Sequence, residues 1–429
     1  MARFFVKLNR MFRFKCRSKQ VFFLSLFGLC VIGLFKLVVF VTSPPLLYKV
    51  AMATLKENYI IKEDANDNAE CSKQIQNINS YVVKLRDVTV DPEKAVKMRW
   101  TPNQLKLEKG FFTVPCIGDS PLTRSSFYGG WSHFSTWATA IHITTYAKNK
   151  FDEIDAVEGY TIAVKRRRTN NVYLKIIDMY NTYVTVKMMK QKPKDVSVLF
   201  IDAHSDESSI NEWNVIFGEA SQIKDISKKQ KYENIIWGIP DGLGPIATYD
   251  LPLPFLDDFR HHVVTSGEAV SSDDISCPSL RISILTPSFK TESKRGRVLQ
   301  HAISNTDDII EQLHKEFPDC DLMIISTESM NMRQQIQAFA KSDILIGPHG
   351  HELSNTMFLH QGAGLIELFP TRYRFFSDNR FRQLASWSNV YYSSWFNMNW
   401  MLRDSEVMTV DPDVVIDMVS EMKKILCSS

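Results

Sequence analysis

Short apolar runs alternate with amphipathic stretches between residues 281 and 368, and few folds accommodate this order. The apolar runs have the length of strands, and the amphipathic stretches repeat their apolar residues at helical spacing. We expect strands at Arg281–Leu285, Leu322–Ser326, Asp343–Gly347 and Ala363–Leu368, and helices at about Met332–Lys341, Glu352–Leu359 and Asp411–Leu426. Strands and helices that alternate through short turns form a parallel sheet covered on both faces. Residues 271–400 are therefore predicted to form a Rossmann-like domain, followed by a C-terminal helix at 401–429.

The preceding part of the chain mixes helical and strand patterns. Trp131–Tyr146 has a helical spacing of apolar residues, whereas Val196–Ile201 is a continuous apolar run, as in a buried parallel strand. The polar stretch Ser266–Ser276 predicts an interdomain linker. We therefore predict a second Rossmann-like domain at 111–270 and an α/β architecture in which the two domains face each other across a cleft.

The N-terminal part of the chain predicts a membrane anchor. Residues 1–20 hold seven Lys and Arg residues and no acidic residue, which is typical of a cytosolic basic tail. Sixteen of the twenty-one residues at 21–41 are Leu, Ile, Val or Phe, a length that spans a bilayer, and Lys36 is near enough to one end to snorkel. A cleaved signal peptide or a buried helix is the alternative. A single-pass type II protein of the Golgi or endoplasmic reticulum membrane would then have residues 42–110 as a lumenal stem.

Charge and cysteine content narrow the class further. Without the basic tail and Lys36, 43 basic residues stand against 48 acidic ones, which disfavours a nucleic-acid partner. Five cysteines fall on the expected lumenal side, where disulfides persist: Cys71, Cys116, Cys277, Cys320 and Cys427. Because five is odd, at least one has no partner within the chain, and the pairing of the others stays open. No C-x-x-C motif is present, so a structural zinc site is disfavoured.

The segment Asp343–Pro370, DILIGPHGHELSNTMFLHQGAGLIELFP, predicts a diphosphate site. A strand runs into a tight Gly-Pro-His-Gly turn and then a helix, which would place backbone amides and the positive end of a helix dipole at the carboxyl edge of a parallel sheet. Glu367 ends the next strand and is suited to bind the vicinal hydroxyls of a ribose. We expect the ligand that carries this diphosphate to be bound by Gly347, His349, Gly350, Ser354, Asn355 and Glu367.

This segment resembles the signature of glycosyltransferase family 61, in which an apolar strand leads into Gly-Pro-His-Gly-Ala, a Leu-x-Asn helix, a Phe-Leu-x-x-Gly turn and Glu-Leu-Phe-Pro. Upstream, Trp131–Phe134 resembles the histidine motif of the family, Asp202–Phe217 its Asp-containing segment, and Gln334–Ile336 the helix before the signature. The resemblance implies the glycosyltransferase B type of fold. It also implies an inverting enzyme that moves a monosaccharide, such as xylose, arabinose or N-acetylglucosamine, from a UDP-sugar to a glycan or glycoprotein hydroxyl. The UDP-sugar would be a co-substrate with no cofactor required, and dependence on a divalent metal stays open.

An inverting reaction needs a base for the acceptor hydroxyl, and the first domain should supply it across the cleft. His133, Asp202 and Asp206 are the candidates, although His133 also fits a core histidine and the two acids also fit a turn after a strand.

Two departures from the family pattern bear on the donor site. His351 and Glu352 follow His-Gly, where the family has Ala and then Gly or Gln. Thr286–Ser288 stands where the family often has an arginine, and Arg297 is a later cation that could replace it at the phosphate.

Other interpretations compete with catalysis. The bulky pair His351 and Glu352 motivates a non-catalytic lumenal protein that binds a nucleotide or glycan with the same fold. A metal site at His349, His351 and His360 is disfavoured because chelating histidines usually lie four apart on a helix. A phosphate-ester hydrolase would need a nucleophile motif or a metal cluster, and the sequence contains neither. We interpret the Asp-x-Asp motif at 319–321 as a solvated turn and the KRRR run at 165–168 as an exposed hairpin end.

Overall fold

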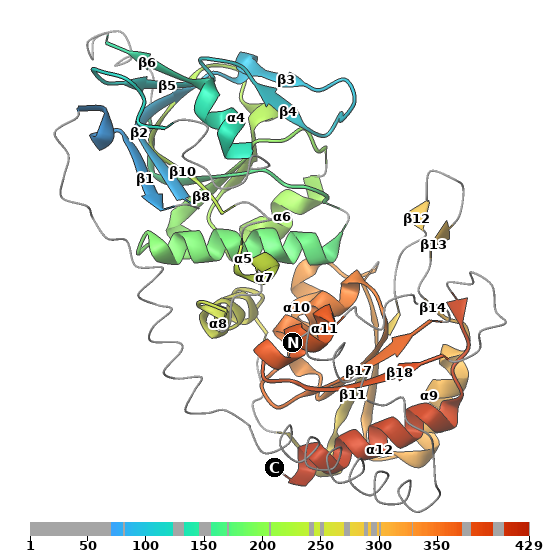
Figure 1. Cartoon of the computed structure of the whole chain (residues 1–429). Coiled ribbons are helices and arrows are strands. Elements are labelled where there is room, and N and C mark those ends of the chain that lie inside the picture. The colour runs from blue at the N-terminus through green and yellow to red at the C-terminus, as the bar shows by residue number, and fades with distance from the viewer. Residues whose placement is uncertain are drawn as a thin grey trace, which may run out of the picture. The chain divides into compact units, whose positions relative to one another are not determined.

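Two separate β-sheets, each with its own helices, organise the described residues (Figure 1). The computed structural model describes the chain from Glu70 to Ser428 apart from internal gaps, the longest of which are 123–132, 146–155, 371–378 and 398–406. These residues belong to one compact unit, Lys56–Ser429. The predicted tail and membrane span lie outside them and stay predictions. Within the described part, no helix has the length and apolar character needed to cross a membrane.

The first sheet has eight strands and is mixed. Its order is β6-β5-β2-β10-β7-β8-β9, and β1 pairs with β2. The four strands β10, β7, β8 and β9 are parallel neighbours, whereas β2 runs antiparallel to β1, β5 and β10. The strands are β1 (Ile75–Asn79), β2 (Val82–Val90), β5 (Phe112–Pro115), β6 (Ile141–Thr144), β7 (Ala156–Val164), β8 (Val196–Phe200), β9 (Ala220–Gln222) and β10 (Gln230–Trp237).

This sheet corrects two sequence-based expectations. Residues from Glu70 onward, predicted as stem, are part of the folded sheet, because the apolar side chains of β2 are buried in it. The helix expected at Trp131–Tyr146 is shorter, since α4 (His133–Ala140) gives way to β6 at Ile141. The residues of β6 include β-branched side chains, which favour a strand.

Two helices of the first half connect parallel strands, one between β7 and β8 and the other between β8 and β9. Asn171 caps α5 by accepting a hydrogen bond from the Leu174 amide, and α5 is largely buried. The helices are α5 (Val172–Met188), α6 (Glu207–Ile216), α7 (Pro245–Thr248) and α8 (Leu256–Ser266), with 3-10 turns η1 (Glu70–Lys73), η2 (Pro92–Lys94), η5 (Pro193–Asp195) and η6 (Ile223–Asp225). A hairpin of β3 (Ala95–Lys97) and β4 (Leu105–Leu107) forms a two-stranded sheet of its own.

The second sheet is parallel throughout, as predicted. Its order is β15-β11-β16-β17-β18, which in chain order is the doubly wound 2-1-3-4-5 arrangement. The two strands β16 and β17 are buried along their whole length, which explains their uninterrupted apolar runs. The strands are β11 (Arg281–Thr286), β15 (Asp321–Ser326), β16 (Ile344–Pro348), β17 (Gly364–Phe369) and β18 (Tyr391–Phe396).

The remaining elements of the second half surround this sheet. The bounds of α10 are those expected from the sequence, and a capping box between Asn331 and Gln334 begins it. The helices are α9 (Thr306–Glu316), α10 (Met332–Lys341), α11 (Arg380–Trp387) and α12 (Pro412–Ser428), with 3-10 helices η8 (Cys277–Ser279) and η9 (His351–Phe358). Short strand pairs are β12 (Thr291–Glu292) with β13 (Val298–Leu299) and β14 (Ala302–Ile303) with β19 (Val407–Met408).

Two disulfides and a shared apolar cluster stabilise these elements. Disulfides join Cys71 to Cys116 and Cys277 to Cys427, while Cys320 is a buried free thiol, so the expectation that at least one of these five cysteines has no partner within the chain is confirmed. Side chains of both halves pack in one cluster, in which the Tyr173 and Phe381 rings lie 6.3 Å apart. The predicted architecture of two Rossmann-like domains across a cleft is not confirmed: the described residues are mixed α/β, and of their two large sheets the second alone is purely parallel.

Candidate functional site

The turn between β16 and η9 lies at the carboxyl edge of the second sheet. The 2-1-3-4-5 order reverses between β11 and β16, and ligands bind at such a switch point in open α/β sheets. Gly347 permits a close approach here, because a Cβ atom on it would lie 2.9 Å from Cδ2 of Leu353 and 3.2 Å from Cβ of Leu285. The strand, turn and first residues of η9 therefore pack tightly and hold His349 just beyond the end of β16.

His349 is part of a buried series of hydrogen-bonded side chains. Its Nδ1 atom contacts Oε1 of Glu367, which lies on β17 next to the end of β16, and the two residues are 4% and 1% exposed. The Tyr392 hydroxyl donates to Oε2 of Glu367 over 2.6 Å. Because an ionised carboxylate only accepts hydrogen bonds, the imidazole must carry a proton on Nδ1, and Glu367 sets its tautomer.

Aromatic packing and charge complete this environment. The His349 ring stacks on Phe369 with centroids 4.7 Å apart, and the Phe381 ring meets it edge-on at 5.4 Å. Burial and the negative charge of Glu367 raise the pKa of Tyr392 well above its usual value, so this tyrosine remains a donor. The imidazole orientation is thus determined by an acid, a phenol and two rings.

The other predicted donor residues lie in or beside η9, which is a 3-10 rather than an α-helix. The Ser354 hydroxyl donates to the His351 carbonyl over 2.6 Å, and the Asn355 amide donates to the Glu352 carbonyl over 3.0 Å. Both side chains are buried and stabilise the helix itself. Gly350 has an extended backbone.

His351 and Glu352, which depart from the family pattern, follow this turn directly and begin η9. Glu352 is buried, and its Oε2 atom lies 3.0 Å from the position of a Cβ on Gly350 and 3.5 Å from Nδ1 of His351. Its carboxylate therefore lies against the turn that was predicted to bind phosphate. Two amides of the turn are used within the protein, because His349 donates to Leu368 and Leu353 donates to Gly350.

The candidate bases of the first half are only partly described. The backbone of His133 begins α4, and its side chain lies outside the described residues, as do Asp206 and Arg297. Asp202 follows β8 and is fully buried. It accepts from Nε and Nη2 of Arg166 at 3.0 and 2.8 Å. The KRRR run is thus not simply an exposed hairpin end, since its second residue, Arg166, is buried in this pair.

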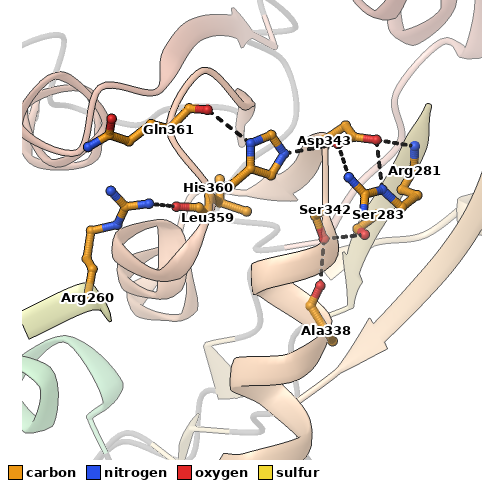
Figure 2. Close-up of polar contacts among 9 residues, drawn as sticks. All are labelled: Arg260, Arg281, Ser283, Ala338, Ser342, Asp343, Leu359, His360 and Gln361. Carbon is orange, nitrogen blue, oxygen red and sulfur yellow. Dashed lines mark hydrogen bonds and ion pairs between the residues drawn. The ribbon is translucent and has the colours of Figure 1, made fainter. Parts of the chain in front are cut away.

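A second polar cluster lies at the opposite end of β16, around Asp343 (Figure 2). Asp343 accepts hydrogen bonds from Nε of Arg281 over 2.9 Å and from Nε2 of His360 over 3.0 Å. Burial alone would raise the pKa of Asp343, but the hydrogen bonds from His360 and Arg281 outweigh it and hold this pKa below its usual value. His360 therefore belongs to the amino end of β16 and His349 to the carboxyl end, which is not the arrangement of a shared metal site.

Sequence reasoning overlooked three residues that the structure places beside the candidates. Tyr392 had no local sequence signal, because it lies 25 residues from Glu367 in the chain. The contact between the two is visible only in the folded structure. Arg166 and His204 lie beside Asp202 at the end of β8, and the DAHSD run that contains His204 was available as a signal. In the ranges that the structure describes, no group of three or more His, Cys, Asp or Glu side chains could hold a metal ion.

Parts of this chain match known glycosyltransferases. A family model described as Glycosyltransferase 61 matches residues 253–366. Beta-1,2-xylosyltransferase RCN11 of Oryza sativa subsp. japonica is 19% identical over 265 residues, covering 55% of this chain and 49% of that protein. A beta-1,2-xylosyltransferase of Arabidopsis thaliana is 19% identical over 357 residues, covering 72% of this chain and 64% of that protein. The chain thus spans between half and two thirds of these relatives.

Solved structures are also similar over part of their length. Rubredoxin oxygen:oxidoreductase from Desulfovibrio gigas has a TM-score of 0.24 and 10% identity, with 46% of this chain and 44% of that chain covered. A score this low supports no conclusion about fold or function.

Proposed function

This chain belongs to glycosyltransferase family 61, and from that membership we propose that it transfers a monosaccharide from a nucleotide sugar to an acceptor hydroxyl. The observation that carries the proposal is the buried series of His349, Glu367 and Tyr392 at the carboxyl edge of a parallel sheet. The edge is the usual ligand position in this class of sheet, and an oriented imidazole suits the charge of a diphosphate.

The proposed donor is a UDP-sugar, and xylose is the first sugar to test because both curated relatives are named beta-1,2-xylosyltransferases. N-Acetylglucosamine is the next. With both ring nitrogens protonated, His349 would donate from Nε2 to an oxygen of the leaving diphosphate, while Glu367 accepts from Nδ1 and holds the ring. Arg297 remains a proposed second cation. No cofactor is needed for this reaction, and a chelator would test whether a divalent ion assists it.

In the proposed inverting reaction, a glycan or glycoprotein hydroxyl attacks the anomeric carbon while a base removes its proton. His133 and Asp206 stay candidates for that base. Asp202 suits a positioning role better, because Arg166 binds both of its carboxylate oxygens.

A second candidate function is supported by Glu352. A carboxylate beside Gly350 would oppose a diphosphate in the same turn, and this favours a lumenal protein that binds a nucleotide or glycan without turnover. The two functions share the fold and differ in whether UDP is released in the presence of an acceptor.

We propose that the protein is held in the Golgi or endoplasmic reticulum membrane by residues 21–41, with the folded part in the lumen. The two disulfides support this location, since disulfides persist in oxidising compartments.

The decisive experiment is a thermal-shift titration of the full chain, purified in detergent, with UDP, UDP-xylose and UDP-N-acetylglucosamine. A ligand at 100-fold excess over its Kd stabilises the folded state by about 2.7 kcal/mol. We expect this stabilisation with UDP ligands, and we expect His349→Ala to abolish it. His314→Ala, at an exposed histidine of α9, is the matched control and should behave as wild type.

Two outcomes separate the candidates. If wild type is not stabilised by any uridine nucleotide, the transferase proposal is wrong, and the second function is left only as glycan binding. Stabilisation without release of UDP, across a panel of glycan and glycoprotein acceptors, would favour the binding protein over the transferase.

A further inference from the structure

Three side chains at the carboxyl edge of the first sheet form a polar cluster outside the donor site. Arg166 follows β7, and Asp202 and His204 follow β8. Asp202 accepts four hydrogen bonds, from the amide, Nε and Nη2 of Arg166 at 3.1, 3.0 and 2.8 Å and from the His204 amide at 3.1 Å. This carboxylate therefore fixes the positions of the arginine and the histidine and has little capacity left for a substrate.

Two nitrogen atoms of this cluster are buried and have no hydrogen-bond partner among the described residues. They are Nη1 of Arg166 and Nε2 of His204, in residues that are 3% and 7% exposed. The Arg166 guanidinium lies over the Phe200 ring at 3.8 Å, so its position is set on one face by an aromatic ring and on one edge by Asp202. Folded proteins rarely leave such atoms unsatisfied, and an absent ligand is one of the accepted explanations.

The location of the cluster also indicates a ligand. The strand order of the parallel part reverses between β7 and β10, and Arg166 directly follows β7 at this switch point. The Ala203 amide donates to the Asn103 carbonyl over 3.1 Å, which brings the tip of the β3–β4 hairpin to the same edge. Trp100 on this hairpin is 85% exposed, and a solvent-exposed aromatic face can stack against a sugar ring.

We propose that this cluster binds the acceptor glycan and that His204 is the base which takes the proton of the attacking hydroxyl. The inference rests on the proposed transferase function. Arg166 Nη1 would donate to the acceptor oxygen, and Nε2 of a neutral His204 would accept its proton. As the oxygen forms a bond to the anomeric carbon, the bond from that carbon to the diphosphate breaks, and the electron pair leaves with UDP.

The test is His204→Leu in the full chain, which removes the basic nitrogen and replaces the ring with an apolar side chain. We expect kcat to fall by about 10²–10⁴-fold, the range for loss of a general base, with the UDP-induced thermal shift unchanged. We also expect the Tm of the ligand-free variant to equal or exceed that of wild type, because the change removes an unpartnered buried atom. His314→Ala is again the control.

A purely structural histidine would give the opposite result, with a lower Tm and a kcat that falls only as the folded fraction falls. If wild type releases UDP and His204→Leu retains kcat within about twofold, or if the variant loses UDP binding, this inference is wrong while the transferase proposal stands. If wild type itself releases no UDP, the transferase proposal fails and this inference fails with it. Should His204→Leu not fold, His204→Gln tests the same point, because an amide cannot take the proton.

Discussion

A buried carboxylate is stable only while its oxygen atoms accept hydrogen bonds. Glu367 meets this condition with His349 on one oxygen and Tyr392 on the other. The same two contacts determine how the imidazole is oriented at the candidate donor site. The proposed function and the stability of this site therefore involve the same three side chains.

Tyr392→Phe removes the donor to Oε2 of Glu367 and leaves the ring in place. We expect it to lower the free energy of unfolding by about 1–3 kcal/mol, the cost of an unsatisfied buried acceptor, and to weaken UDP binding through a less firmly held His349. Urea denaturation and the UDP titration measure the two effects. Tyr391→Phe, at the exposed neighbouring tyrosine, should change stability by no more than about 0.5 kcal/mol. Equal stability of the two variants would contradict the role of this hydroxyl.

Among the secondary-structure elements, strand β16 is fixed by contacts at both of its ends. At its carboxyl end Gly347 packs closely against Leu353, and at its amino end Asp343 accepts from Arg281 and His360 (Figure 2). The Arg260 side chain donates to the Leu359 carbonyl, so α8 contacts the residue before His360. A substitution at the amino end should therefore affect stability more strongly than it affects nucleotide binding at the carboxyl end.

Asp343→Asn should destabilise the protein by about 3–5 kcal/mol at pH 7, because it breaks a buried ion pair from one side. The pKa of Asp343 is lower in the folded than in the unfolded state, so its contribution is fully present above the unfolded pKa of about 4. That contribution is lost as the pH falls through the folded pKa. Denaturation of wild type and variant across this range should show their difference shrinking with acid. Asp321→Asn, at the exposed start of β15, is the control, and a pH-independent difference would contradict the prediction.

The disulfide between Cys277 and Cys427 acts at the scale of the whole molecule. It joins η8 before the second sheet to the C-terminal helix α12, across a sequence separation of 150 residues. A bridge over so long a loop restricts the unfolded chain strongly, with a stabilisation of about 2–5 kcal/mol in native examples. An oxidising compartment is needed to keep it.

Replacing both Cys277 and Cys427 by Ser should therefore lower the free energy of unfolding by about 2–5 kcal/mol. Guanidinium denaturation with and without a reductant measures the effect, and the double variant should lie between oxidised and reduced wild type, because the reductant also opens the Cys71–Cys116 bridge. Cys320→Ala, which removes only the free thiol, is the control and should keep its sensitivity to reductant. Identical unfolding of wild type in both conditions would show that the bridge does not form.

The second sheet and the order of its elements could be predicted from the amino-acid sequence. The expected strands at Arg281–Leu285 and Leu322–Ser326 and the expected helix at Met332–Lys341 are all present, because apolar periodicity and capping are properties of adjacent residues. The turn after Gly347 was likewise recognisable from its own residues.

Contacts between residues that are distant in the sequence became known from the folded structure. It placed β2 antiparallel in a sheet expected to be parallel, paired Asp202 with Arg166 across 36 residues and paired His349 with Glu367 across 18. Strand neighbours depend on how the apolar faces of separate segments are buried together, and each such choice sets the partners of the polar side chains at the strand ends. The local pattern of a segment does not determine which distant segment becomes its neighbour.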